Sequence, residues 1–206
     1  MIIQNFHHKI PDYTKYYYNK NVCILGTGPS LAKYDIDYTK YDTVVGCNRI
    51  FLTEYMNHVN VLYHNLHGWE EITLETFIYS LPKYHKLQRV LFSPFHSLKT
   101  PTNVNPLAKA VKKVNFDKYD IAINLTTIVG DRLLAGRPYT GLVATYHCSL
   151  FPPKSLDIYG FDFYEGEESY VVPMKEYSNN TLHHKEANKK ILTEIVGMSP
   201  NYNWFQ

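Results

Sequence analysis

The sequence contains few cysteines, no long apolar run and no recognisable leader. Only three cysteines occur, Cys23, Cys47 and Cys148, so they cannot all pair with one another. Cys23 and Cys47 lie in predicted buried strands, where a free thiol behaves as a small hydrophobic side chain. The first residues hold no apolar run of the roughly 7–15 residues that a secretory signal requires, and nowhere do about 18 apolar residues follow one another. We therefore expect a cytoplasmic protein of a reducing compartment without a transmembrane segment, with peripheral attachment to a membrane left open.

A strong excess of one charge is also missing. The chain has 21 basic and 19 acidic side chains and a formal net charge of +2, which is too little to predict binding to nucleic acid. No spacing of cysteines and histidines typical of a metal site is present, so we expect neither a metal ion nor another cofactor. A small-molecule partner is favoured.

What is present is a regular alternation of apolar strands and helical patterns over 206 residues, a length that suits one domain. The predicted strands are 22–25, 43–48, 59–63, 87–92, 120–125 and 156–161. The predicted helices are 68–79, 106–114, 126–134, one that opens at Thr140 and Gly141, and one that ends at Val196. This alternation predicts a single Rossmann-like α/β/α domain with a mainly parallel sheet. Its parts are a lead-in arm at 1–21, the core at 22–196 and a tail at 197–206.

A glycine turn, GTGPS, follows the first predicted core strand. Gly26 and Gly28 allow the backbone to turn sharply and to approach a ligand. A helix that opens at Pro29 or Ser30 would offer free N–H groups to a phosphate. The third glycine of the dinucleotide-binding fingerprint is absent, so on its own this turn is better explained as a plain connection between strand and helix.

Polar residues stand at the ends of several predicted strands. They are Asn48, Arg49, His64, Asn65, His67 and Asp162. Because ligands of open parallel sheets bind beyond the carboxyl ends of the strands, the repetition predicts a cleft along this edge. Each residue alone is more readily explained as a cap or a turn former.

Two histidines, His183 and His184, precede the last predicted helix. Its buried stripe is predicted to be Ala187, Ile191 and Ile195. A histidine in the first turn of a helix feels the positive end of the helix dipole, which disfavours the imidazolium and leaves a neutral base. A histidine that only caps or packs explains the pair at least as well.

Six pieces of the sequence occur in a fixed order, and they are ILGTGPSL, GCNRIF, VLYHN, RPYTG, IYGFDFYEGEESY and the histidine pair before an amphipathic helix. On these pieces, which span residues 22 to about 196, the chain resembles the bacterial sialyltransferases of glycosyltransferase family 42. The specific part is RPYTG together with two tyrosines six residues apart, Tyr164 and Tyr170. The resemblance implies a metal-independent sialyltransferase with a variant of the GT-A-like fold and CMP-sialic acid as its donor.

The resemblance also implies a role for each matched residue. Tyr164 and Tyr170 would bind the phosphate of the departing CMP, and Arg137 would face the sialic acid carboxylate or the phosphate. His183 or His184 would be the general base, and the spacing leaves open which of them. The implied donor pocket comprises Gly26, Thr27, Gly28, Ser30, Asn48, His64, Asn65, Tyr139, Thr140, Gly141 and Asp162. Within it, His64 stands where the family has a donor-binding asparagine, unless Asn65 takes that place by a shift of one residue.

The implied reaction is attack of a glycan hydroxyl on the sialyl anomeric carbon with inversion, while a histidine removes the proton. The acceptor would be a galactoside or a sialoside. Two alternatives stay open: another nucleotide-sugar transferase of the type that carries GxGPSL, and a non-catalytic relative that binds nucleotide or glycan. The acceptor, the linkage and the oligomeric state, including a homo-oligomer, are not determined by the sequence.

Overall fold

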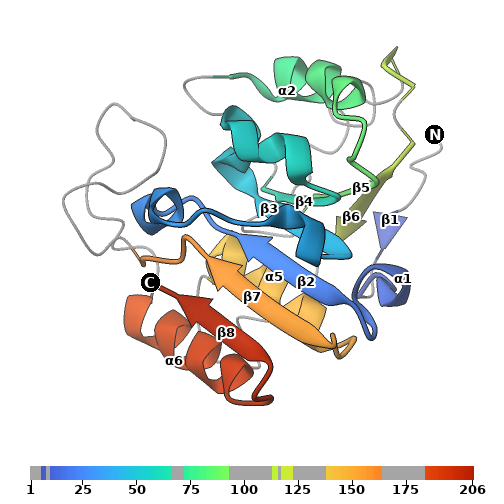
Figure 1. Cartoon of the computed structure of the whole chain (residues 1–206). Coiled ribbons are helices and arrows are strands. Elements are labelled where there is room, and N and C mark those ends of the chain that lie inside the picture. The colour runs from blue at the N-terminus through green and yellow to red at the C-terminus, as the bar shows by residue number, and fades with distance from the viewer. Residues whose placement is uncertain are drawn as a thin grey trace.

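In the part of the chain that the structure describes, eight parallel strands form one sheet (Figure 1). The computed structural model describes residues 6–7, 10–65, 72–92, 113–115, 117–122, 138–163 and 184–206. Its strands are β1 (Phe6–His7), β2 (Asn21–Leu25), β3 (Thr43–Cys47), β4 (Val61–His64), β5 (Arg89–Phe92), β6 (Tyr119–Ala122), β7 (Ser155–Tyr159) and β8 (Tyr202–Phe205). They lie in the order β1-β6-β5-β4-β3-β2-β7-β8, and each neighbouring pair is parallel. Because β2 lies between β3 and β7, the strand order changes direction at β2.

Helices cover both faces of this sheet. The α-helices are α1 (Thr14–Tyr17), α2 (Leu74–Ser80), α5 (Thr140–Ser149) and α6 (Lys185–Val196), and the 3₁₀ turns are η1 (Pro29–Lys33), η2 (Tyr38–Lys40), η3 (Asn48–Leu52), η4 (Glu54–His58) and η5 (Leu81–Lys83). Figure 1 shows α5 and α6 behind β2, β7 and β8. Side chains of α1, α5 and α6 form one hydrophobic cluster with the sheet, and those of η1, η3, η4 and α2 form a second. The predicted α/β/α arrangement with a parallel sheet is confirmed.

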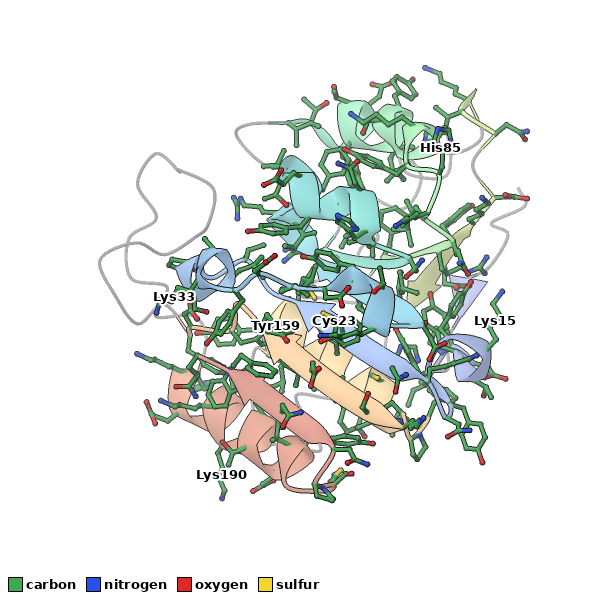
Figure 2. All side chains as sticks on the ribbon, in the orientation of Figure 1. Lys15, Cys23, Lys33, His85, Tyr159 and Lys190 are labelled. Carbon is green, nitrogen blue, oxygen red and sulfur yellow. The ribbon has the colours of Figure 1, made fainter. Side chains whose placement is uncertain are left out.

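The central strands are buried on both faces, as their nearly continuous apolar sequences predict. Every residue of β3 is buried. On β2, Ile24 belongs to the first cluster and Cys23 to the second, and Figure 2 shows Cys23 close to Tyr159 of the neighbouring strand β7. All three cysteines are buried and free, and burial raises the pKa of each thiol. The prediction that Cys23 and Cys47 are buried, unpaired side chains is therefore confirmed.

The two ends of the chain supply the edge strands of the sheet. The lead-in arm contains β1 and α1, and β1 forms a parallel pair with β6. The predicted tail contains β8, which pairs with β7 at the edge of the sheet. Trp204 of β8 packs on the first cluster and Phe205 on the second. Successive side chains of this short strand therefore lie on opposite faces of the sheet. Predicted helix 126–134 lies outside the described residues, as does all of 106–114 apart from its last two residues.

A chain of buried hydrogen bonds fixes the arm to the sheet. His147 Nε2 lies 2.7 Å from the carbonyl oxygen of Pro11, which can only accept, so this nitrogen carries the proton. His147 Nδ1 therefore accepts from the Tyr63 hydroxyl at 2.6 Å. Tyr63 in turn accepts from Tyr17 at 2.9 Å. Burial lowers the pKa of His147 to about 4, which keeps this imidazole neutral.

The arm is also bonded to an ion pair between β5 and β6. Arg89 donates two hydrogen bonds to the carboxylate of Asp120, at 2.5 and 2.7 Å. The hydroxyl of Tyr13 donates to the same carboxylate at 3.0 Å. Since Asp120 is only 2% exposed, these bonds compensate for the desolvation of its charge. The arm is therefore an integral part of the fold.

Candidate functional site

A cleft opens at the carboxyl ends of β3, β2 and β7, where the strand order changes direction. Among the described residues it is lined by Gly26, Thr27, Gly28, Cys47, Asn48, Arg49, Tyr139, Thr140, Gly141, Gly160, Phe161, Asp162 and Phe163. Such a switch point is where open parallel sheets bind their ligands. Eight of the predicted donor-pocket residues are in this set, so the structure brings together segments that are far apart in the sequence.

The glycine turn after β2 packs tightly against the segment after β7. The N–H of Gly26 donates to the carbonyl of Tyr159, and the N–H of Gly28 donates to the carbonyl of Gly160, both at 2.8 Å. A Cβ atom at Gly28 would lie 2.6 Å from Cγ of Asp162 and 2.8 Å from the Gly160 oxygen. Glycine is thus required here by the close approach of two chain segments.

Asp162 caps the start of η1. Its Oδ2 accepts from the backbone N–H of Ser30 at 2.7 Å, and its Oδ1 accepts from the Ser30 hydroxyl in a short hydrogen bond. The expectation that Ser30 offers a free N–H to a phosphate is therefore wrong, since a carboxylate already occupies that position and would repel a second anion. In addition, η1 is a five-residue 3₁₀ turn rather than the predicted α-helix. This end of the cleft suits a neutral hydroxyl rather than a phosphate.

Asn48 joins three parts of the cleft. Its backbone is left-handed, with φ of 47°, a conformation that asparagine tolerates better than most residues. Its Nδ2 donates to the hydroxyl of Thr140 at 2.9 Å, and its Oδ1 accepts from the N–H of Asn65 at 3.0 Å. The side chain thus connects the end of β3 with the end of β4 and the start of α5.

The two alternatives at the end of β4 have different surroundings. His64 is 1% exposed and its ring stacks on Phe77 with centroids 4.1 Å apart, so it lies in the second hydrophobic cluster's region rather than on the cleft wall. Asn65 is bonded to Asn48, and its buried Oδ1 has no hydrogen-bond partner in the described part of the chain. Of the two residues, Asn65 is the one connected to a residue of the cleft.

The start of α5 forms the opposite wall. Gly141 is packed against the ring of Phe161, where a Cβ atom would lie 3.2 Å from Cδ1 and closer still to other ring atoms. Arg49 also lines the cleft, although only 7% of it is exposed. A helix start and a guanidinium both favour negative charge. Arg49 was recognised from the sequence only as a polar residue at a strand end, without a role of its own.

His184 lies next to the cleft wall through its backbone. It is the N-cap of α6 and its side chain is exposed. Its carbonyl accepts from Nδ2 of Asn188 at 2.8 Å, while Oδ1 of Asn188 accepts from the N–H of Tyr139 at 2.9 Å. The predicted stripe is confirmed at Ile191 and Ile195. Asn188 was not predicted as a site residue, although its polar side chain lies on the apolar side of the helix.

Four predicted site residues, Arg137, Tyr164, Tyr170 and His183, lie outside the described residues, and their roles stay predictions. Three of them have a described neighbour: Pro138 follows Arg137, Phe163 precedes Tyr164, and His184 follows His183. Phe163 and Tyr139 line the cleft, and Pro138 is buried. Within the described ranges, no group of three or more histidine, cysteine, aspartate or glutamate side chains could hold a metal ion. No helix in those ranges is both long and apolar enough to cross a membrane.

Solved structures with the same fold are known. The chain is similar to the sialyltransferase CST-II in complex with a trisaccharide acceptor and CMP, with 17% identity over 90% of this chain and 80% of that one, and a TM-score of 0.60. A variant of CST-II in complex with CMP gives 16% identity, coverage of 90% and 81%, and a TM-score of 0.64. The monofunctional alpha-2,3-sialyltransferase Cst-I from Campylobacter jejuni gives 14% identity, coverage of 97% and 79%, and a TM-score of 0.61. No protein family and no curated protein sequence matches the chain. At these identities the likeness establishes a shared fold.

Proposed function

We propose that this protein is a sialyltransferase-like glycosyltransferase that moves sialic acid from CMP-sialic acid to a glycan hydroxyl with inversion. The observation that carries the proposal is the cleft at the switch point of the sheet, in a fold shared with sialyltransferases that were solved with CMP. The six sequence pieces that resemble glycosyltransferase family 42 include the segments that line this cleft.

The cleft has two ends of different character, and they suggest the orientation of the donor. Each oxygen of Asp162 accepts one hydrogen bond from Ser30, and a carboxylate has about four acceptor positions in all. The remaining positions would accept ribose hydroxyls. The phosphate would then lie away from Asp162, toward Arg49 and the start of α5, where positive charge and helix dipole favour an anion.

The leaving group would be stabilised by side chains rather than by a metal. In this proposal, Arg49 and Arg137 supply fixed positive charge, and the hydroxyls of Tyr164 and Tyr170 donate to the phosphate as the bond to the sugar breaks. Donors aimed at developing charge are an effective source of catalysis, with single donors contributing roughly 10²–10³-fold. Asn48, held by Thr140 and Asn65, would present a rigid polar wall to the donor.

The general base in this proposal is His184 or His183. It removes the proton from the acceptor hydroxyl as that oxygen attacks the anomeric carbon of an oxocarbenium-like sialyl group. General base catalysis contributes roughly 10²–10⁴-fold. The variants His184→Ala and His183→Ala should therefore identify the base, because only the correct one loses most of the transfer while it still binds CMP.

The proposal is tested by incubating the protein with CMP-sialic acid and either lactose or a sialylated lactose, with and without EDTA. We expect release of CMP together with a sialylated product in at least one reaction, unaffected by EDTA. A thermal-shift comparison of CMP, UDP and GDP should give stabilisation by CMP alone. Selective stabilisation by UDP would identify a different nucleotide-sugar transferase, and stabilisation by CMP without turnover would identify a non-catalytic binding protein.

A further inference from the structure

Asn188 is a buried amide on the apolar side of α6. Its exposed fraction is 0%. It lies one helical turn before Ile191 and Leu192, which are buried against the sheet. An amide in such a place is unfavourable unless its donors and its acceptor are bonded. Its bonding partners therefore indicate what it does.

The two ends of this amide are bonded to two different segments. Oδ1 accepts from the backbone N–H of Tyr139 at 2.9 Å, and Nδ2 donates to the backbone carbonyl of His184 at 2.8 Å. Tyr139 is the N-cap of α5 and lines the cleft. His184 is the N-cap of α6. One side chain thus connects the starts of two helices.

Neither bond is needed to complete a helix. The carbonyl of His184 already accepts from the backbone N–H of Asn188 at 2.9 Å, so the side chain adds a second bond to the same oxygen. The N–H of Tyr139 precedes the first turn of α5 and has no carbonyl partner within that helix. The two bonds of the amide instead fix the distance between the His184 backbone and Tyr139 of the cleft wall.

We propose that Asn188 is a positioning residue that holds the His184 backbone beside the cleft wall. The inference rests on the proposed function, in which His184 or His183 is the general base. Reacting atoms must be about 3–3.5 Å apart in a productive complex, and a displacement of about 1 Å can reduce the rate roughly 10²-fold. Asn188 is not among the residues that line the cleft, and in this proposal it acts through the backbone of His184.

Two substitutions separate the two bonds. Asn188→Asp keeps an oxygen that can accept from Tyr139, but an ionised carboxylate cannot donate to His184. Asn188→Leu has a similar size and removes both bonds. Ile191→Val, in the same buried row of α6, is the matched control, because it loosens the packing of the helix without removing a polar contact. The kcat of each variant is compared with that of Ile191→Val at temperatures equally far below the Tm of each protein. If Asn188→Leu does not fold, Asn188→Asp alone provides the result.

We expect kcat for sialyl transfer to fall roughly 10- to 100-fold in both Asn188 variants. In Asn188→Asp the KM for the donor and the thermal shift with CMP should stay within about twofold of the wild type, because the bond to Tyr139 is kept. Ile191→Val measures how far a loss of stability alone changes kcat, the KM for the donor and the thermal shift with CMP.

Two results would overturn the inference. The first is that both Asn188 variants lose no more kcat than Ile191→Val at the same Tm. The second is that Asn188→Asp loses CMP binding together with turnover, which would make Asn188 part of the donor pocket's support. A wild-type protein that releases no CMP from CMP-sialic acid would overturn the proposed function itself, and the role of Asn188 with it.

Discussion

The carboxylate of Asp162 accepts the backbone N–H of Ser30 at 2.7 Å, although the two residues are 132 positions apart in the sequence. A side chain from the segment after β7 thus completes the turn after β2. The same side chain faces the cleft. Its structural and its proposed functional roles can be separated by substitution.

Asp162→Ala removes both bonds to Ser30 and should destabilise the protein by roughly 2–3 kcal/mol, because bonds to a charged acceptor contribute about 1.5–3 kcal/mol. Asp162→Asn can keep both contacts, with its oxygen on the N–H and its NH₂ on the hydroxyl, and should cost about 1 kcal/mol. Urea denaturation measures both values. Ser30→Ala, which removes only the hydroxyl bond, is the control. An alanine variant as stable as the wild type would mean that the cap contributes nothing.

Asn48 should be more sensitive to alanine than to glycine. Both substitutions remove the bonds to Thr140 and Asn65, but alanine must also adopt the left-handed φ of 47°. That conformation costs an ordinary residue about 1–2 kcal/mol, whereas glycine adopts it freely. We therefore expect Asn48→Ala to be less stable than Asn48→Gly by about 1 kcal/mol in urea denaturation. The opposite order would show that this backbone conformation is not present in solution.

The glycines of the cleft should resist even a methyl group. In Gly28→Ala the new Cβ would overlap Asp162, and in Gly141→Ala it would overlap the ring of Phe161. Overpacking of this kind costs about 1–3 kcal/mol. Gly197 is the control, because a Cβ atom there would lie 3.4 Å from its nearest neighbours, in ordinary contact. Thermal unfolding should show a lower Tm for the first two variants and an unchanged or higher Tm for Gly197→Ala.

His147 should make the fold sensitive to acid. Its pKa is about 4 in the folded protein, against an ordinary value of 6.5, because it is buried. The unfolded chain therefore binds the proton more tightly. The stabilisation that comes from the neutral imidazole is complete above about pH 6.5 and is lost as the pH falls from there toward 4. A shift of this size corresponds to roughly 3 kcal/mol.

The test of this prediction is the free energy of unfolding of the wild type and of His147→Gln at pH 7.5 and at pH 5. Glutamine can still donate to the Pro11 carbonyl but does not titrate. Carboxylates such as Asp12, whose pKa is lowered by its bonds to Thr14, titrate in both proteins and cancel in the comparison. Equal losses of stability in the two proteins would exclude His147 as the acid-sensitive group.

The sequence predicted the parallel sheet well, because strands buried on both faces are nearly continuous apolar runs. It also predicted that the ends of β2, β3 and β7 meet, since that follows from the direction of parallel strands. It could not choose between His64 and Asn65, because neighbouring strand residues point to opposite faces and a shift of one position reverses them. The position of β8 was missed because Tyr-Asn-Trp-Phe is short and follows a proline and polar residues.

The details of the site depend on contacts between distant segments. Nothing near Ser30 in the sequence shows that a carboxylate 132 residues later would cap its N–H. The role of Asn188 is similar, since a single polar residue in an apolar stripe shows that something is unusual but not which group it binds. Local patterns predict elements, whereas partners across the fold become known only from the structure.

The pairing of β2 with β7 has a consequence for biosynthesis. Asn21 on β2 faces Ser155 on β7, so one side of β2 has no neighbour until most of the chain has left the ribosome. At about 5–20 residues per second, synthesis of the intervening stretch takes roughly 7–27 seconds. During that time the nascent chain exposes an unpaired apolar strand that could pair wrongly with other chains, and chaperones that bind extended apolar segments would be most useful to it then.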